Sequence, residues 1–340
     1  MPALVIINPG HLCLVQDLGR FNVGQFGLSQ GGACDLHAHC WGQKALGNPI
    51  TNSSIEILFG HAQFQATDTI TMILTGADCQ AVTTPSLQPI SSWQPFTLNK
   101  GECLTLKRPK SGLRTYLSIQ GAFDIPSHLG SVSTVMRNQV GGINNGEPLK
   151  KGDILAIKQD TLSPIAPTSD SPRSRSPMAG SQIPRSQIST YPALQKIKLI
   201  PSYQHATFSD AFRRDFFQRT FTVSPQTDRM GIRLTIDQTS SPSSTSTSPQ
   251  LSQPRLTPQD ISMISEGIVC GSVQITHGGS PIILLQDRQT LGGYRKIGVV
   301  AFRDLMKLGQ LRPGDQLMFE RTNLEVERVK QRAFFHAFSL

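Results

Sequence analysis

The stretch "GSVQITHGGSPIILLQ" (271–286) contains two short apolar runs, "GSVQIT" (271–276) and "PIILLQ" (281–286), with a Gly-rich segment between them. Each run is too short for a helix and is rich in Val or Ile, which favours β-strands. Similar runs recur along the chain, among them "ALVII" (3–7), "SIEIL" (54–58) and "IKLI" (197–200). Gly and Pro number 29 and 23 among 340 residues, which favours frequent turns. The sequence therefore predicts a mainly β fold.

Two segments instead have helical spacing. Their apolar residues recur three or four and then seven positions apart, at Ala38, Trp41 and Ala45, and at Ala301, Leu305 and Leu308. We expect a short helix at each place.

Two Ser/Pro-rich segments indicate the domain organisation. Residues 159–189 have too little apolar surface to offset the entropy of ordering, so they are predicted to form a disordered linker. Residues 239–258 interrupt a patterned region and are predicted to be a loop insertion. The predicted domains are therefore 1–158 and 190–340.

A short repeat suggests that the two domains are related. Each domain contains a similar phrase near its end, "LKKGDIL" (149–155) and "LRPGDQL" (311–317). In both, a basic residue precedes a Gly-Asp turn and the start of an apolar run. We expect the same closing hairpin twice.

The composition disfavours several classes of protein. The net charge is +9, yet no block of five or more Lys or Arg occurs and no nucleic-acid-binding motif accompanies the charge. An anionic substrate or an acidic partner would explain the excess. No apolar run approaches the roughly 18 residues that cross a bilayer, and the N-terminus lacks a signal-peptide pattern. The six scattered cysteines include no C-x-x-C pair, so we predict a reduced, cytoplasmic protein. From the charge pattern and the short apolar runs we predict no nucleic-acid partner and no membrane partner.

The segment "GLSQG" (27–31) matches the G-x-S-x-G nucleophile elbow of hydrolases. That elbow needs a preceding strand and an oxyanion donor from an earlier strand–helix loop of an α/β sheet. The 28 residues before Ser29 are too few for such a sheet, so a Gly-rich loop is the preferred interpretation.

The next residues, Asp35, His37, His39 and Cys40, are of types that bind metals. On a helix only Asp35 and His39 share a face, so four ligands do not converge. Asp35 is instead predicted to cap the helix start, where its carboxylate accepts free backbone N–H groups. No metal site is predicted.

Six longer stretches, in fixed order, resemble one protein family. They are "VQDLGRFNVGQFGLSQGGACDLHAHCWGQKALGNP" (15–49), "IEILFG" (55–60), "LTGAD" (74–78), "GLRTYLSIQGAFDIPSHLGSVST" (112–134), "VSPQTDRMGIRL" (223–234) and "ISEGIVCGSVQITHGGSPIILLQDRQTLGGYRKIG" (264–298). Together they are similar to the biotin-dependent carboxyltransferase-like family, also called the allophanate hydrolase subunit 2 family. Its best-understood branch is the C component of the bacterial 5-oxoprolinase. The resemblance covers both predicted domains, 5–158 and 196–325.

The resemblance implies two cyclophilin-like β-barrel domains with a few short helices. It also implies a subunit of an ATP-dependent 5-oxoprolinase, which cleaves 5-oxo-L-proline to L-glutamate with ATP, accompanied by Mg²⁺. The implied partners are homologues of the B and A components of that enzyme, and no bound biotin is expected. Because a lactam is resonance-stabilised, phosphorylation of its amide oxygen gives ATP a chemical role. The chain has no G-x-x-x-x-G-K-[ST] loop, so ATP binding follows from the resemblance alone.

The sequence departs from the family pattern in three places. A loop that usually reads like Ser-Gly-Ala-Met-Asp is Gly31 to Asp35 here, with Gly31 and Cys34 as the replacements. Val132 stands where an Arg is common, and "PSYQ" (201–204) replaces a Pro-Gly-Pro turn. These departures leave the substrate more open than the fold.

Arginine residues are the first candidates for a transfer site, because such a site must neutralise developing negative charge. Arg20, Arg229 and Arg288 lie in the matching motifs beside Gly or Asp. The alternative for each is a structural salt bridge with a nearby aspartate, namely Asp17, Asp228 or Asp287.

The predicted catalytic residues are Arg229 and the two carboxylates Glu266 and Asp287. Both carboxylates lie at or near the ends of apolar runs, where they could face a cleft or equally stabilise a turn. Neutral donors suit a lactam or ureido group, and adjacent glycines allow a close backbone approach. The residues predicted to bind substrate or nucleotide are Arg20, Gly32, Asp35, Gln274, Arg288, Gln289, Thr290, Gly292, Gly293 and Tyr294.

Two other functions stay open. One is the carboxyltransferase component of a urea or allophanate pathway, which would need a biotin carrier in trans because no biotinyl domain is recognised. The other is a regulatory protein that binds a kinase-inhibitor-type homologue of the B component.

Overall fold

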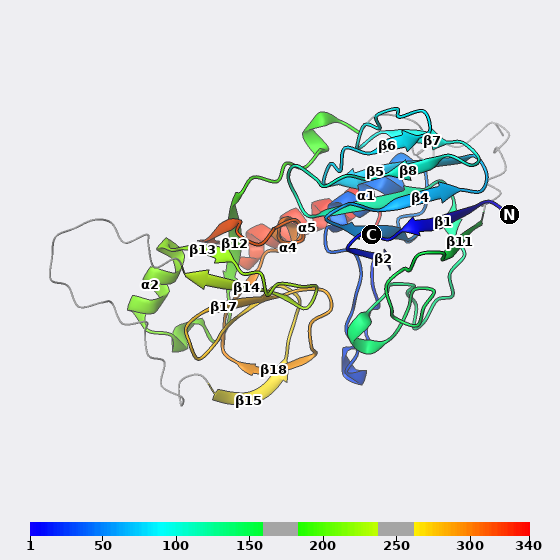
Figure 1. The fold of residues 1–340 in the computed structure, drawn as a ribbon. Coiled ribbons are helices and arrows are strands. Elements are labelled where there is room, and N and C mark those ends of the chain that lie inside the picture. The colour runs from blue at the N-terminus through cyan, green and yellow to red at the C-terminus, as the bar shows by residue number, and fades with distance from the viewer. Residues whose placement is uncertain (159–182, 237–261) are drawn as a thin grey trace, which may run out of the picture. The chain divides into compact units, whose positions relative to one another are not determined.

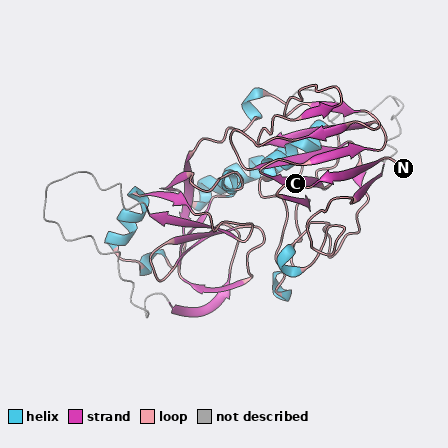
Figure 2. Ribbon diagram, in the orientation of Figure 1, coloured by secondary structure: helices cyan, strands magenta, loops and turns pink. Residues whose placement is uncertain are grey.

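A computed structural model of the chain describes residues 1–158, 183–236 and 262–340. The chain forms two units of dense internal contact. Unit 1 contains Met1–Arg20 and Gly31–Thr190, and unit 2 contains Phe21–Gln30 and Tyr191–Leu340. Strands predominate in both, as Figure 2 shows. The mainly β prediction is confirmed.

The predicted linker and the predicted insertion lie largely outside the described residues. The insertion 239–258 and residues 159–182 of the linker lie outside the described residues. The last residues of the linker differ from the expectation, because η3 (Arg185–Gln187) forms there and Ile183 is buried. A buried apolar side chain supplies the stabilisation that the Ser/Pro-rich composition lacks.

Unit 1 is built from two antiparallel sheets (Figure 1). The six-stranded sheet has the order β10 (Ala122–Phe123), β11 (Ile154–Lys158), β1 (Ala3–Asn8), β4 (Gln63–Ala66), β8 (Cys103–Thr105) and β6 (Val82–Thr84). The five-stranded sheet has the order β2 (Leu12–Gln16), β3 (Ser54–Leu58), β9 (Arg114–Ile119), β5 (Ile70–Gly76) and β7 (Pro95–Leu98). Alternate residues of both sheets meet in one core, where Leu4 and Phe64 join Ile57 and Leu117.

Helix α1 (Leu36–Ala45) packs on β5 and β9, at the position predicted from helical spacing. Asp35 caps it as predicted, because its carboxylate accepts from the Ala38 N–H at 3.0 Å. Gly42 lets the helix approach the sheet closely. A Cβ there would lie 2.9 Å from the Ser118 hydroxyl.

The histidines of α1 have local structural partners. His39 is fully buried, with Nδ1 2.8 Å from the Ser54 hydroxyl and Nε2 3.3 Å from the Ile50 carbonyl. The His37 Nε2 accepts from the indole N–H of Trp41 at 3.0 Å. Across the described ranges, no group of three or more His, Cys, Asp or Glu is placed to hold a metal ion.

We expect the stability of unit 1 to fall in mild acid because of His39. Burial lowers the pKa of His39, so the unfolded chain takes up a proton that the folded ring resists. The free energy of unfolding should therefore decrease as the pH falls below about 6.5. Urea unfolding followed by fluorescence would measure this in unit 1, since Trp41 and Trp93 are the two tryptophans of the chain. The variant His39→Gln should show a flatter pH dependence than the wild type, whereas an equal slope would contradict the assignment.

Unit 2 contains a closed barrel of seven strands. Their order is β12 (Leu194–Pro201), β19 (Lys296–Val300), β16 (Ser272–Ile275), β17 (Pro281–Leu284), β14 (Gly231–Ile236), β13 (Thr220–Val223) and β20 (Gln316–Arg321). The ring closes because β20 pairs in parallel with β12, with Leu194 opposite Gln316. The stretch 271–286 forms the antiparallel pair β16–β17. Closure removes the exposed edges of the sheet.

A two-stranded sheet accompanies the barrel in unit 2. It pairs β15 (Ser262–Gly267) with β18 (Leu291–Tyr294), and Glu266 lies opposite Gly292. The segment Phe21–Gln30 also belongs to this unit and includes η1 (Gly24–Phe26). The sequence-based domain boundaries assign this segment to the first domain, 1–158.

In the described ranges, four helices lie between or after the barrel strands along the sequence. They are η4 (His205–Thr207), α2 (Asp210–Gln218), α4 (Phe302–Leu308) and α5 (Leu324–Phe338). Helix α4 confirms the second predicted helix, whereas α2 and α5 were not predicted. Phe216 of α2 stacks on Phe319 of β20 with ring centroids 4.8 Å apart, so the helix covers part of the barrel core with aromatic rings.

The repeated phrase forms the same turn in both units. The Asp153 carboxylate accepts from the Lys150 N–H at 2.8 Å, and the Asp315 carboxylate accepts from the Arg312 N–H at 2.8 Å. The intervening Gly152 and Gly314 both have φ of +91°, a conformation that glycine adopts most readily. Each turn leads into the last strand of its unit, β11 or β20.

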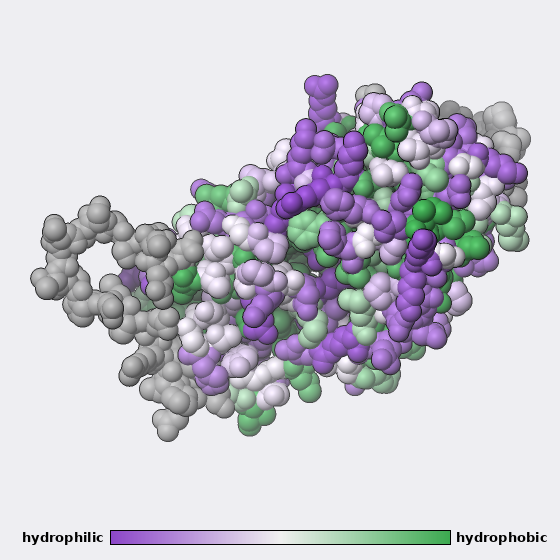
Figure 3. All heavy atoms as spheres, in the orientation of Figure 1, coloured by the Kyte–Doolittle hydropathy of each residue, from purple (hydrophilic) through white to green (hydrophobic). Residues whose placement is uncertain are grey.

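The visible surface in Figure 3 is largely hydrophilic, with hydrophobic residues in small patches. Among the described residues, no helix combines the length and the apolar character that a membrane span requires.

Candidate functional site

Glu266 of β15 is the centre of a polar cluster in unit 2. Its carboxylate forms an ion pair with the Lys296 ammonium and accepts from the Tyr203 hydroxyl. The Gln204 amide donates to the same carboxylate at 3.0 Å. The carbonyl end of that amide accepts from the Lys296 N–H at 2.7 Å, which fixes the amide orientation. Three donors therefore converge on one carboxylate.

Within the cluster, the lysine is buried and the carboxylate is partly exposed to solvent. The side chain of Lys296 is 6% exposed, whereas that of Glu266 is 31% exposed. The hydrogen bond from Lys296, followed by that from Tyr203, lowers the pKa of Glu266. The same carboxylate raises the pKa of the Tyr203 phenol. Glu266 is therefore a charged acceptor, and Tyr203 is a neutral donor at neutral pH.

Strand register brings Gln274 into this neighbourhood. Gln274 of β16 lies opposite Lys296 of β19. Val273 and Ile275 face the barrel core, so Gln274 between them faces away from it, yet it is 1% exposed. Its amide donates to the Tyr294 carbonyl at 3.4 Å.

The glycine pair of β18 lies close to other residues of unit 2. A Cβ at Gly292 would lie 2.3 Å from the Ile268 Cδ1 and 2.8 Å from the Gln274 amide nitrogen. The close approach that glycine permits is therefore made by two side chains of the same unit. At Gly293 the nearest atom would be the Met263 carbonyl oxygen, at 3.2 Å.

Arg229 and Asp287 are partners of one another. Two parallel hydrogen bonds of 2.9 Å join the guanidinium to the carboxylate, and both side chains are at least 96% buried. The backbone N–H of Asp287 also donates to the Arg229 carbonyl at 2.9 Å. This geometry favours the salt-bridge alternative over a ligand clamp. The partner lies 58 residues away rather than at Asp228, whose carboxylate caps a turn.

The residues after Asp287 form a connection that internal hydrogen bonds hold in place. Arg288 donates to the Ile268 carbonyl at 3.2 Å, and the Thr290 carbonyl accepts from the Ile268 N–H at 3.0 Å. The Ser29 hydroxyl donates to the Arg288 carbonyl at 2.7 Å. Ser29 is thus a buried loop residue, in agreement with the preferred interpretation of "GLSQG". Gln289 is half-buried beside them.

Unit 1 contains the other predicted binding residues. Arg20 is 1% exposed and donates to the carbonyls of His128 and Ser131 at 3.0 and 3.2 Å. Gly32 has φ of +91°, and its N–H donates to the Gln16 side chain at 3.1 Å. With Asp35 at the helix cap, all three have structural contacts.

The structure therefore groups the predicted residues into three places. Glu266, Gln274, Gly292, Gly293 and Tyr294 share the strands β15, β16 and β18. Arg229 and Asp287 pair with each other, and the connection of Arg288, Gln289 and Thr290 follows directly after Asp287 in the same unit. Arg20, Gly32 and Asp35 lie in unit 1. Sequence reasoning missed Lys296, Tyr203 and Gln204, although a lysine directly before the apolar run "IGVV" (297–300) is a signal for a cation next to a buried strand.

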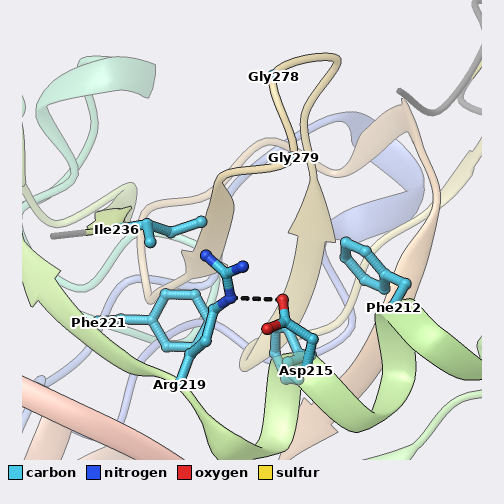
Figure 4. A pocket seen from close by; sticks show the side chains of 8 residues that line it. Phe212, Asp215, Arg219, Phe221, Ile236, Gly278 and Gly279 are labelled. Carbon is cyan, nitrogen blue, oxygen red and sulfur yellow. Dashed lines mark hydrogen bonds and ion pairs between the residues drawn. The ribbon is translucent and has the colours of Figure 1, made fainter. Parts of the chain in front are cut away.

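One cavity of unit 2 is apolar and too small for a substrate. It lies among Phe212, Phe221, Ile236 and the turn of Gly278 and Gly279, and the ion pair of Asp215 and Arg219 stands beside it (Figure 4). Its free volume is about 20 Å³, which accommodates roughly one water molecule.

Comparisons with known proteins identify relatives of the whole chain. The family model described as carboxyltransferase domain, subdomain A and B, matches residues 26–321. The C component of 5-oxoprolinase from Haemophilus influenzae is 32% identical over 320 residues, 94% of this chain and 91% of that protein. The protein of the same name from Escherichia coli is 30% identical over 97% of this chain and 94% of its own length.

A solved structure shows the same fold in a longer enzyme. The crystal structure of the K. lactis urea amidolyase matches 99% of this chain with a TM-score of 0.83 and 25% sequence identity. This chain spans 20% of that protein.

Proposed function

The chain belongs to the carboxyltransferase family with subdomains A and B, and from this membership we propose that it is a subunit of an ATP-dependent 5-oxoprolinase. The observation that carries the proposal is the similarity to two proteins named as the C component of 5-oxoprolinase, each over more than nine-tenths of both chains. Similarity along the full length supports an equivalent component, whereas a shared domain alone would support only a shared fold.

We place the contribution of this chain at the Glu266 cluster. A lactam presents a carbonyl oxygen and an N–H, and the cluster offers the matching groups. The Lys296 ammonium is a positive charge that would stabilise an oxyanion on the lactam carbonyl, and Glu266 would accept from the lactam N–H. Tyr203, 74% exposed, donates its one O–H to Glu266 at the open side of the cluster.

ATP, with Mg²⁺, enters the proposal as a substrate of the assembled enzyme. The internal partners of Arg229 and Arg288 support a location for its phosphates other than these two guanidinium groups. Activation of the lactam by phosphoryl transfer would then involve the implied partners, homologues of the B and A components.

The direct test is reconstitution. The purified chain is mixed with the homologues of the A and B components from its own organism, and the release of ADP and glutamate is measured with and without 5-oxo-L-proline. We expect both products to depend on this chain and on the lactam. If all three proteins together release no glutamate, the proposal is wrong.

A second function, carboxyl transfer from carboxybiotin, is favoured by the structural match to urea amidolyase. It predicts that the chain transfers CO₂ from a carboxylated biotin carrier to urea. Radiolabelled bicarbonate, a biotin carboxylase and its carrier would test it, and transfer of label to urea with no lactam-dependent ADP release would favour this function over the first.

A further inference from the structure

A second cavity of unit 2 is lined by cationic side chains. It lies beside α2 and the end of β20, and its free volume is about 440 Å³. Arg213 and Arg214 come from α2, Arg321 is the last residue of β20, and His205 is the first residue of η4. Three separate elements therefore contribute basic side chains to one hollow.

The charges around this cavity are unbalanced. Among the described residues that line it, Asp210 is the one carboxylate, and it forms an ion pair with Arg213. Arg214 and Arg321 form no ion pair with any residue in the described ranges. Two guanidinium groups thus stay without a counter-charge next to the same space, where an anion would be attracted.

His205 has a buried donor that lacks an acceptor. Its Nδ1 lies 3.5 Å from the Arg213 guanidinium, which can only donate, so Nδ1 is the acceptor and Nε2 has the proton. The side chain is 8% exposed, and the Nε2 atom has no hydrogen-bond partner among the described residues. A buried N–H without an acceptor is costly.

We propose that this cavity is a binding site for a phosphate-type oxyanion, either inorganic phosphate or the phosphate group of a small monoester. Guanidinium groups match the tetrahedral oxygens of phosphate in geometry and charge. Arg214 and Arg321 supply charge-assisted hydrogen bonds, and the His205 ring lies beside them in the cavity wall. A carboxylate ligand is a weaker match because it has fewer acceptor oxygens for the two guanidinium groups.

The site uses other side chains than the Glu266 cluster and requires neither ATP nor partner proteins. Burial and the charges of Arg213 and Arg321 lower the pKa of His205. A bound dianion would oppose these two arginine charges and raise the pKa of the ring. Binding therefore has a spectroscopic signature that the lactam reaction does not share.

The test is calorimetric titration of the full isolated chain, without nucleotide or partners, with inorganic phosphate and separately with glycerol 3-phosphate. We expect saturable binding of at least one of these two anions. The anion with the lower dissociation constant indicates whether the site prefers free phosphate or a phosphate monoester. The variant Arg321→Met should weaken binding by about tenfold to a hundredfold, the usual cost of a lost charged hydrogen bond. An NMR titration of His205 should show a higher pKa in the presence of the anion.

The matched control is Arg332→Met, which removes an exposed arginine from α5 in the same unit. It lowers the net charge by the same amount and should leave the affinity unchanged. Equal weakening by both variants would show general charge attraction and overturn the proposal. Absence of saturable binding of either anion at millimolar concentration would also overturn it. Both results are independent of whether the reconstituted enzyme opens a lactam.

Discussion

Replacing Asp287 by Ala should lower the free energy of unfolding by about 3–5 kcal/mol, because it removes the carboxylate that neutralises the buried Arg229 guanidinium. The pair is joined by two hydrogen bonds of 2.9 Å and is closed to solvent. The measurement is urea unfolding followed by far-UV circular dichroism, with hydrogen exchange of β14 and β17 peptides as a local readout for unit 2.

The double variant Arg229→Met with Asp287→Leu separates a structural role from a catalytic one. It removes both charges and refills the space with apolar atoms, so we expect much of the lost stability to return. The substitution Asp228→Ala is a matched control, since that aspartate is a neighbour in sequence but only caps a turn. An Asp287→Ala protein as stable as the wild type, but inactive, would contradict the structural interpretation.

Replacing Lys296 by Met should lower the rate of glutamate formation by the reconstituted enzyme by about 10²–10³-fold. This is the usual effect of removing one donor that stabilises an oxyanion. The prediction rests on the proposed function, because the ammonium is the buried cation of the Glu266 cluster. Methionine has a similar length, so the fold should be retained, and circular dichroism checks this.

Lys198→Met is the matched control for the activity measurement. Lys198 lies on β12 of the same barrel and forms an ion pair with Glu320, outside the Glu266 cluster. We expect it to leave the rate unchanged within a factor of about two, as partly exposed ion pairs contribute little. Full activity of Lys296→Met would mean that the Lys296–Glu266 pair only joins β19 to β15.

Much of the local structure can be predicted from short sequence patterns. The turn before the last strand of each unit was predicted from two seven-residue phrases, and the aspartate that closes each turn makes the same 2.8 Å hydrogen bond. The Asp35 cap and α1 also follow from short-range patterns. Such features depend on residues three or four positions apart, so a single sequence contains the whole interaction.

Helices α2 and α5 were not predicted from the sequence pattern. Each begins at a capping residue, Ser209 or Asn323, whose side chain accepts from a backbone N–H. Both caps could have been found from the sequence. The aromatic run "FRRDFF" (212–217) is ambiguous in periodicity alone, and the packing of Phe216 on the ring of Phe319 decides it.

The site was only partly predictable because its contacts are long-range. Strands, turns and caps follow from the amino-acid pattern alone, which also indicated Glu266 and Gln274 as candidate site residues. The pairing of Glu266 with Lys296, and of Arg229 with Asp287 rather than Asp228, exists only in the folded barrel. The barrel register sets these pairs, and residue spacing does not reveal which polar groups of distant strands are brought together. The same is true of the cationic cavity, which β20, α2 and η4 form only when the barrel closes.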